Sequence, residues 1–275
     1  METVRWLIVT DLDGTLLDHD TYSAGPAKDT LAALARKNIP VVINSSKTYA
    51  EITTLRKSLN NSHPFVIENG SAVTLPSEYF NLDSGSTDCV NSSVADETII
   101  LGTRREALLA LLPKLTTLFK DKFLSYSQCS IDDIVRLTGL SFSEATDSAN
   151  RHYSEPMKWL GSDVDKQDFV EYLHQHDVYC LEGGRFIHLM GNTDKGKATH
   201  FLAKQYSDYY QQPLKTIALG DSHNDIAMLQ AADIAVVVRS PYHAPPEFDH
   251  PHKIISNAYG PAGWSEVICS LVLKK

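Results

Sequence analysis

Short apolar runs that end in turn residues alternate with segments of helical apolar spacing near the start of the chain. The apolar runs at residues 4–9, 39–43 and 65–67 predict buried strands. Between them, residues 26–37 and 48–59 predict helices, the first of which opens with a proline suited to a first helical turn. This order of strands and helices predicts a parallel, doubly wound α/β sheet with right-handed connections.

From about residue 79 the pattern changes, and the segment 81–93 is rich in serine, aspartate and asparagine, which predicts a surface excursion. Strands and helices beyond it do not follow the earlier alternation, which indicates an α+β insertion with its own small core. The expected elements are a strand at 98–101, helices at 104–119, 131–138 and 141–151, a strand at 157–160, a helix at 166–176, and a hairpin of strands 178–181 and 185–190.

The alternating pattern returns after Gly191. Asp194 is placed to cap a helix that extends to about residue 210. A strand at 216–219, a helix from 224, a strand at 234–238 and a final helix from about 262 follow. We therefore predict a Rossmann-like core domain formed by residues 1–80 and 191–275, with residues 81–190 inserted as a cap.

Composition narrows the class of protein. The 275 residues carry a formal charge of −9, which argues against general binding to nucleic acid or acidic membranes. The four cysteines form no CxxC pair and are expected to be reduced thiols, and the histidines form no HExxH motif. The chain has no apolar segment long enough to cross a bilayer and no signal peptide, so we expect a cytoplasmic protein. No obligate protein partner is indicated.

Two acidic motifs directly follow predicted strands, Asp11 with Asp13 after the first strand and Asp221 with Asp225 after a later one. Side chains at positions i and i+2 of an extended segment face the same way, and ligands in open α/β sheets bind beyond the carboxyl ends of the strands. Four uncompensated carboxylates in one crevice would be costly, so we expect a divalent cation there, Mg²⁺. An EF-hand calcium loop is excluded because the segment from Asp11 lacks the glycine and the glutamate that such a loop requires at fixed positions. The Asp221 pair also fits a helix N-cap with an acidic first turn.

Such a site suits phosphoryl transfer. Asp11 is the candidate nucleophile, which would form an aspartyl-phosphate, and Asp13 is the candidate general acid and base. Ser45 follows the strand at 39–43 and is placed to bind phosphate oxygens, although a serine at a helix start is often only a cap. Lys195 is the candidate cation for the phosphoryl charge, with Lys197 as the competing choice.

These motifs together resemble the haloacid dehalogenase (HAD) superfamily of phosphohydrolases. The resemblance implies an α/β cap of type C2 between the second and third motifs, and it implies catalytic roles for Asp11, Asp13, Ser45 and Lys195 and metal binding by the four aspartates. One position departs from the pattern: Ser222-His223 stands where relatives carry small residues. We expect His223 to affect pH dependence or access to the metal.

Further segments resemble the mannosyl-3-phosphoglycerate phosphatase family: Ser45 to Ile52, Glu68-Asn69-Gly70, Gly183 to Phe186 with His188, and Gly260 to Trp264. The resemblance implies Mg²⁺-dependent hydrolysis of mannosyl-3-phosphoglycerate to phosphate and mannosylglycerate, a compatible solute.

A substrate with both a phosphate and a carboxylate needs cations despite the acidic surface. Arg185 is expected to bind the carboxylate, with His188 and Lys47 as additional donors. The alternative for the two cap residues is pairing with cap acids such as Glu182. Glu68 and Asn69 are expected to accept hydrogen bonds from sugar hydroxyls, or else only to build the turn.

Three other functions remain open at this point. The nearest alternative is a phosphatase with the same chemistry that acts on glucosyl-3-phosphoglycerate or another sugar phosphate. A phosphomutase would return the phosphoryl group to a second hydroxyl. A non-catalytic sugar-phosphate sensor would have no need for a nucleophile and its acid, so the four catalytic residue types argue against it.

Overall fold

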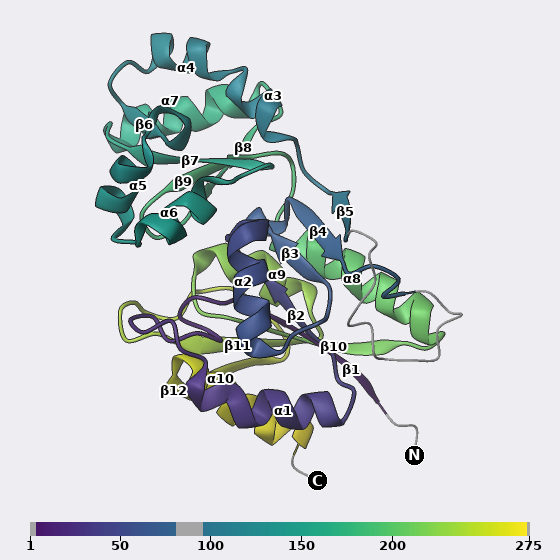
Figure 1. Ribbon diagram of the computed structural model, residues 1–275. Helices are drawn as coiled ribbons and strands as arrows, with labels where there is room; N and C mark the ends of the chain where they lie inside the picture. The colour runs from purple at the N-terminus through teal and green to yellow at the C-terminus, as the bar shows by residue number, and fades with distance from the viewer. Residues whose placement is uncertain (1–3, 81–95, 274–275) are drawn as a thin grey trace.

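A computed structural model of the chain describes residues 4–80 and 96–273. The chain forms two units, a larger one with an eight-stranded sheet and a smaller one with a four-stranded sheet (Figure 1). The larger unit contains both ends of the described chain, and the smaller one contains the middle. This arrangement confirms the predicted α/β core with an inserted cap. The predicted excursion at 81–93 lies outside the described residues.

The large sheet is mostly parallel, in the order β12-β11-β10-β1-β2-β3-β4-β5, with β4 and β5 antiparallel at one edge. β1 and β10 come from opposite ends of the chain yet pair in parallel over the whole length of β1, with Thr10 opposite Leu219. The strands are β1 (Arg5–Thr10), β2 (Val41–Asn44), β3 (Phe65–Ile67), β4 (Ala72–Leu75), β5 (Glu97–Ile100), β10 (Leu214–Gly220), β11 (Ile234–Arg239) and β12 (Lys253–Tyr259).

Helices cover both faces of this sheet because successive side chains of its central strands point to opposite faces, and both faces are apolar. Ile8 of β1 belongs to the core under α1, α2 and α10, whereas Leu7 and Val9 belong to the core under α8 and α9. These helices are α1 (Lys28–Arg36), α2 (Tyr49–Leu59), α8 (Lys195–Tyr210), α9 (Ile226–Ala231) and α10 (Gly260–Ile268). No described helix combines the length and the apolar character needed to cross a lipid bilayer.

The cap sheet is antiparallel, in the order β6-β7-β9-β8. Helices α3, α4 and α7 pack on one face of this sheet, and α5 and α6 lie on the side nearer the core (Figure 1). The elements are α3 (Arg105–Leu109), α4 (Leu112–Leu118), β6 (Phe123–Ser125), α5 (Ile131–Thr138), α6 (Phe142–Ala149), β7 (Ser154–Trp159), α7 (Asp163–His174), β8 (Tyr179–Glu182) and β9 (Ile187–Met190).

Several elements differ from the sequence-based expectation. The helix predicted at 104–119 is two helices, because Pro113 cannot donate a backbone hydrogen bond in a helix interior and instead occupies the first turn of α4. Strands β4, β6 and β12 were not predicted. The first two are only four and three residues long, and β12 at the sheet edge has a single buried residue, Ser256, so it lacks the apolar run that marks the other strands.

The border between core and cap also differs from the predicted one. Strand β5 pairs with β4 in the large sheet, although residue 81 was expected to begin the cap. The two connections between the units lie against each other: a Cβ on Gly191 would come within 2.6 Å of the Thr103 backbone nitrogen. Only glycine permits this approach. We therefore propose that the cap comprises residues 102–190.

Candidate active site

Three carboxylates converge at the carboxyl ends of β1 and β10. Oxygens of Asp11, Asp221 and Asp225 lie within 4.8 Å of one another, and all three residues are buried. Strand pairing brings the two motifs together, since the Asp11 nitrogen donates to the Leu219 carbonyl at 2.9 Å. Gly14 has a φ of +75°, and a Cβ at this position would lie 2.6 Å from Asp221 Oδ2, so glycine is required both by conformation and by space.

Lys195 is the cation of this cluster. Its Nζ lies 2.6 Å from Asp11 Oδ1 and 2.7 Å from Asp225 Oδ1, and its side chain is fully buried. Burial lowers the pKa of Lys195, but the two carboxylates outweigh burial and raise it above the ordinary value. The competing candidate, Lys197, donates instead to the side chain and carbonyl of Asn192 on the surface. Of the two lysines, only Lys195 reaches the carboxylates.

The start of α8 is fixed by a side chain that the sequence reading did not single out. Asn44, the last residue of β2, donates from Nδ2 to the Lys195 carbonyl at 2.9 Å. Asp194 caps the same helix by accepting from the Lys197 nitrogen at 2.8 Å. Together they hold the first turn of α8, and hence Lys195, against the carboxylates.

The carboxylates carry more negative charge than one lysine offsets. Burial, then the nearby Asp225, raises the pKa of Asp221 to about 7. Burial is also the largest cause of the raised pKa of Asp11, which Lys195 opposes. Clustered carboxylate oxygens with raised pKa values are suited to a hard divalent cation, which would replace the retained protons. The three residues therefore fit Mg²⁺.

This cluster should destabilise the metal-free protein at high pH. Between the ordinary pKa of 3.8 and about 7, the folded state holds a proton on Asp221 that the unfolded state has lost, so stability rises as the pH falls through this window. We expect Asp221→Asn to exceed the wild type in free energy of unfolding by about 1–3 kcal/mol near pH 8 in chelator. That gain should shrink toward pH 5.

Chemical denaturation of both proteins across this pH range checks the prediction. The quantity to compare is the difference in free energy of unfolding between the two proteins. Burial lowers the pKa values of His63 and His188, so these residues reduce stability as the pH falls, but they do so equally in both proteins and cancel in the difference. Saturating Mg²⁺ should remove the advantage of the variant. A variant that is less stable than the wild type near pH 8 in chelator would contradict the expectation.

Asp13 lies at the mouth of the cluster. Its Oδ2 pairs with Lys47 Nζ at 2.8 Å, and its side chain remains 38% exposed. Burial lowers the pKa of Lys47, but Asp13 and Glu51 outweigh it and raise the pKa above its ordinary value. Lys47 therefore stays charged beside Asp13. The other oxygen of Asp13, Oδ1, is buried without a hydrogen-bond partner, which leaves it available to a ligand.

A cavity of about 670 Å³ lies between this cluster and the cap. Arg185 and His188 line it from the cap side. Arg185 Nη1 donates to the Thr138 carbonyl at 2.7 Å, whereas Glu182, the acid considered as an alternative partner, pairs with Lys166 at 2.8 Å. The core side of the cavity is lined by Asp11, Asp13, His19, Tyr22, Ser46, Lys47, Glu51, Asp221, Ser222, Asn224 and His243.

Ser45 lies beneath the cavity wall. It is 1% exposed, and its Oγ accepts a hydrogen bond from the Lys47 nitrogen at 3.3 Å. Its neighbours Ser46 and Lys47 do line the cavity. The predicted contact of Ser45 with phosphate stays a prediction.

Glu68 and Asn69 occupy a different place from the one predicted. Glu68 is fully buried and accepts hydrogen bonds from the His152 and Tyr153 nitrogens at 2.9 and 3.1 Å and from Ser154 Oγ at 2.6 Å. Asn69 is 1% exposed, and neither residue lines the cavity. Because cap groups already use both Glu68 oxygens, the geometry contradicts direct binding of sugar hydroxyls by Glu68, whereas the predicted contact of Asn69 stays a prediction. Glu68 instead fastens the cap to the core, a role that its polar type alone did not reveal.

A histidine that was not singled out in the sequence contacts the carboxylates, and the predicted effect of His223 on pH dependence or metal access stays a prediction. His223 is exposed and does not line the cavity. His243, in the loop after β11, places Nε2 at 3.1 Å from Asp221 Oδ2. No motif marks His243 in the sequence, because only the pairing of β10 with β11 brings its loop over Asp221.

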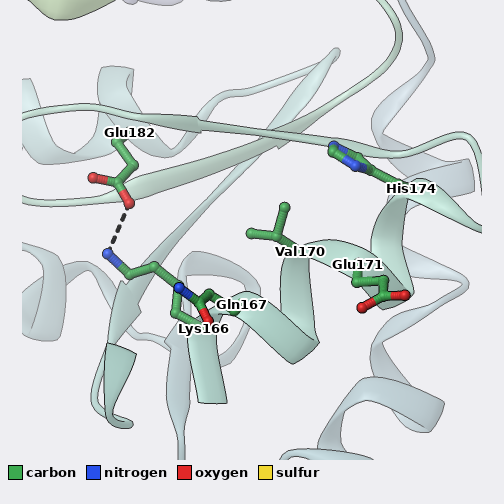
Figure 2. A pocket seen from close by; sticks show the side chains of 6 residues that line it. All are labelled: Lys166, Gln167, Val170, Glu171, His174 and Glu182. Carbon is green, nitrogen blue, oxygen red and sulfur yellow. Dashed lines mark hydrogen bonds and ion pairs between the residues drawn. The ribbon is translucent and has the colours of Figure 1, made fainter. Parts of the chain in front are cut away.

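A second, smaller hollow of about 370 Å³ lies on the cap surface (Figure 2). Five of its lining residues come from α7 and the sixth, Glu182, from β8. Lys166 and Glu182 point toward each other and pair across it (Figure 2). Since α7 lies on the cap face away from the core, this hollow is separate from the carboxylate cluster.

Comparison with known proteins agrees with this geometry. A family model described as haloacid dehalogenase-like hydrolase matches residues 8–88 and 138–243. A glucosyl-3-phosphoglycerate/mannosyl-3-phosphoglycerate phosphatase of Methanococcoides burtonii is 32% identical over 98% of both chains. A protein of the same name from Persephonella marina is 34% identical over 95% of both chains. The solved sucrose-phosphatase of Synechocystis sp. PCC6803 shares the fold, with a TM-score of 0.64 at 14% identity over 98% of both chains.

The chain belongs to the haloacid dehalogenase-like hydrolase family. Within this family it resembles the mannosyl-3-phosphoglycerate phosphatases and is a phosphoric monoester hydrolase.

Proposed function

We propose that this protein hydrolyses glycosyl-3-phosphoglycerates, mannosyl-3-phosphoglycerate first among them, to the glycosylglycerate and phosphate. The observation that carries the proposal is the Asp11–Lys195–Asp225 cluster at the base of a cavity that the cap covers. Two relatives that match nearly the whole chain carry the names of phosphatases for these substrates. The glucosyl compound is the nearest alternative substrate, since both sugars stand in those names.

Asp11 is the proposed nucleophile. Lys195 holds Asp11 Oδ1, so Oδ2 is the oxygen that would attack phosphorus. The new bond between Oδ2 and phosphorus forms as the bond from phosphorus to the glycerate oxygen breaks, which gives an aspartyl-phosphate. Water then attacks phosphorus and releases Asp11 and inorganic phosphate. Lys195 stays charged throughout and offsets the charge of Asp11 and Asp225.

Asp13 is the proposed general acid and base. It would protonate the departing glycerate oxygen and then accept a proton from the attacking water, so one carboxyl group serves both steps. Lys47, paired with Asp13 at 2.8 Å, would hold it in position and contact the phosphate. Mg²⁺ held by the cluster of Asp11, Asp221 and Asp225, with Asp13 at its edge, would neutralise charge on the phosphoryl oxygens.

The remaining site residues would recognise the substrate. Ser45 would bind a phosphate oxygen through its hydroxyl, and the neighbouring Ser46, which lines the cavity, would present its backbone N–H. Arg185 and His188 would contact the rest of the substrate from the cap. The described cysteines are unpaired thiols, as is usual in cytoplasmic proteins, and we place the enzyme there. Its proposed product, a glycosylglycerate, would serve as a compatible solute.

Phosphate release from a panel of esters tests the proposal. We expect Mg²⁺-dependent release from mannosyl- or glucosyl-3-phosphoglycerate with kcat/KM at least about tenfold above hexose phosphates and 3-phosphoglycerate, because cap contacts to the whole substrate lower the barrier. Equal activity on every ester would rule out a preference for glycosyl-3-phosphoglycerates. Isomerised phosphosugar without free phosphate would indicate a mutase, and tight binding without turnover a sensor.

A further inference from the structure

Arg151 is a buried cation that the proposed reaction leaves without a role. It lies between α6 and β7, is 8% exposed and lines the cavity. Its Nη1 donates to Ser154 Oγ at 2.9 Å and to the Ser46 carbonyl at 3.3 Å. Both acceptors are neutral, so neither offsets the charge of the guanidinium.

The nearest carboxylate compensates this charge only in part. Glu68 lies 3.9 Å from Arg151 Nη1, and its two oxygens already accept from two backbone nitrogens and from Ser154 Oγ. Arg151 Nε is buried without a hydrogen-bond partner. A buried guanidinium with unused donors is costly, which favours an anionic ligand at this place.

His188 also lines this cavity and has an unpartnered polar atom. This β9 residue is 8% exposed, and its Nδ1 is buried without a hydrogen-bond partner. Burial and the charge of Arg151 lower the pKa of His188 to about 3. The imidazole is therefore neutral at physiological pH and offers one N–H donor and one acceptor without adding charge.

The position of Arg151 indicates which anionic group of the substrate it would bind. Its contact with the Ser46 carbonyl places it beside the segment that also carries Ser45 and Lys47. In a 3-phosphoglycerate only two carbons separate the carboxylate from the phosphorylated oxygen, so the cation for the carboxylate must lie next to the phosphate segment. Arg185 is held instead by the Thr138 carbonyl.

We propose that Arg151, assisted by His188, binds the carboxylate of the phosphoglycerate substrate and is the specificity-determining cation of the site. This inference rests on the proposed function. It replaces the expectation that Arg185 is the carboxylate ligand and leaves Arg185 to the sugar part of the substrate.

The test compares two esters that differ only at the carboxylate: mannosyl-3-phosphoglycerate and mannosylglycerol 3-phosphate, in which CH₂OH replaces it. The wild type should favour the first by about 10- to 100-fold in kcat/KM, the range for a charge-assisted pair. Arg151→Met should abolish this preference by raising KM for the first ester, with the second changed less than about threefold. Arg151→Lys should retain part of the preference.

Controls separate this role from a structural one. Arg136→Met removes an exposed cap arginine and should keep the full preference. If Arg151→Met does not fold, inhibition of the wild type decides: 3-phosphoglycerate should inhibit at least about tenfold more strongly than glycerol 3-phosphate. Equal inhibition, or equal loss on both esters in Arg151→Met, overturns the inference. If the wild type hydrolyses glycosyl-3-phosphoglycerates but shows no preference for the ester with the carboxylate, the inference is overturned and the proposed function stands. If the wild type hydrolyses neither mannosyl- nor glucosyl-3-phosphoglycerate, the proposed function itself is refuted.

Discussion

Replacing Asp11 by asparagine is expected to lower phosphate release by at least about 10⁴-fold, because an amide cannot form the covalent intermediate. The change is small in volume and keeps a polar group beside Lys195. Phosphate release under single-turnover conditions measures the effect, and mass spectrometry of acid-quenched wild-type protein should detect a phosphorylated peptide that contains Asp11. The variant should lack this peptide.

The same substitution should leave the fold intact. Burial is the largest cause of the raised pKa of Asp11, and the charges of Asp225 and Asp221 add to it, so removal of the Asp11 charge relieves both the cost of burial and this repulsion. Lys195 keeps Asp225 at 2.7 Å. We expect a melting temperature equal to or above that of the wild type, and Asp29→Asn, an exposed change on α1, should behave as the wild type in both assays. Full activity of Asp11→Asn would end the covalent mechanism.

Replacing Lys195 by methionine is expected to cost both activity and stability. The loss of the cation leaves Asp11 and Asp225 buried and unpaired, which should lower the free energy of unfolding by about 3–5 kcal/mol near neutral pH. Activity should fall at least about 10³-fold, since the protein's own cation beside the nucleophile is then missing as the dianionic phosphate approaches. Denaturant unfolding and phosphate release measure the two effects.

The pH dependence distinguishes this mechanism from simple loss of packing. Without Lys195, the pKa of Asp11 rises further, so the folded variant binds protons more tightly than the unfolded chain and regains stability as the pH falls toward the ordinary pKa of an aspartate. A cavity left by lost packing would not respond to pH. Lys197→Met, two residues further along the same helix, should retain stability and activity because Lys197 lies on the surface. A stability deficit that does not change with pH would contradict the charge argument.

Local patterns in the sequence were sufficient for the core of the fold. Apolar runs that end at Asp11, Ser45 and Asp221 predicted the strand ends, and the structure places all three residues directly after β1, β2 and β10. The α/β class, the inserted cap and the family were confirmed. The reason is physical: parallel strands buried on both faces require continuous apolar runs, and catalytic side chains follow at the carboxyl ends.

The sequence failed where a residue's role depends on a neighbour distant in the chain. Glu68 looked like a sugar ligand, yet backbone nitrogens 84 and 85 residues further on saturate it. Strand β5 looked like part of the cap, yet pairing with β4 places it in the core sheet. Short strands carry too few residues for their period to identify the partner sheet.

By itself, then, the sequence determined the class of fold, the family and the carboxylates that meet at the strand ends. Only the tertiary structure decided that Lys195 and not Lys197 reaches them, that His243 contacts Asp221, and that the charge of Arg151 in the cavity is compensated only in part. These outcomes depend on burial and on distances between atoms far apart in the chain, which a local pattern of polar and apolar residues does not encode.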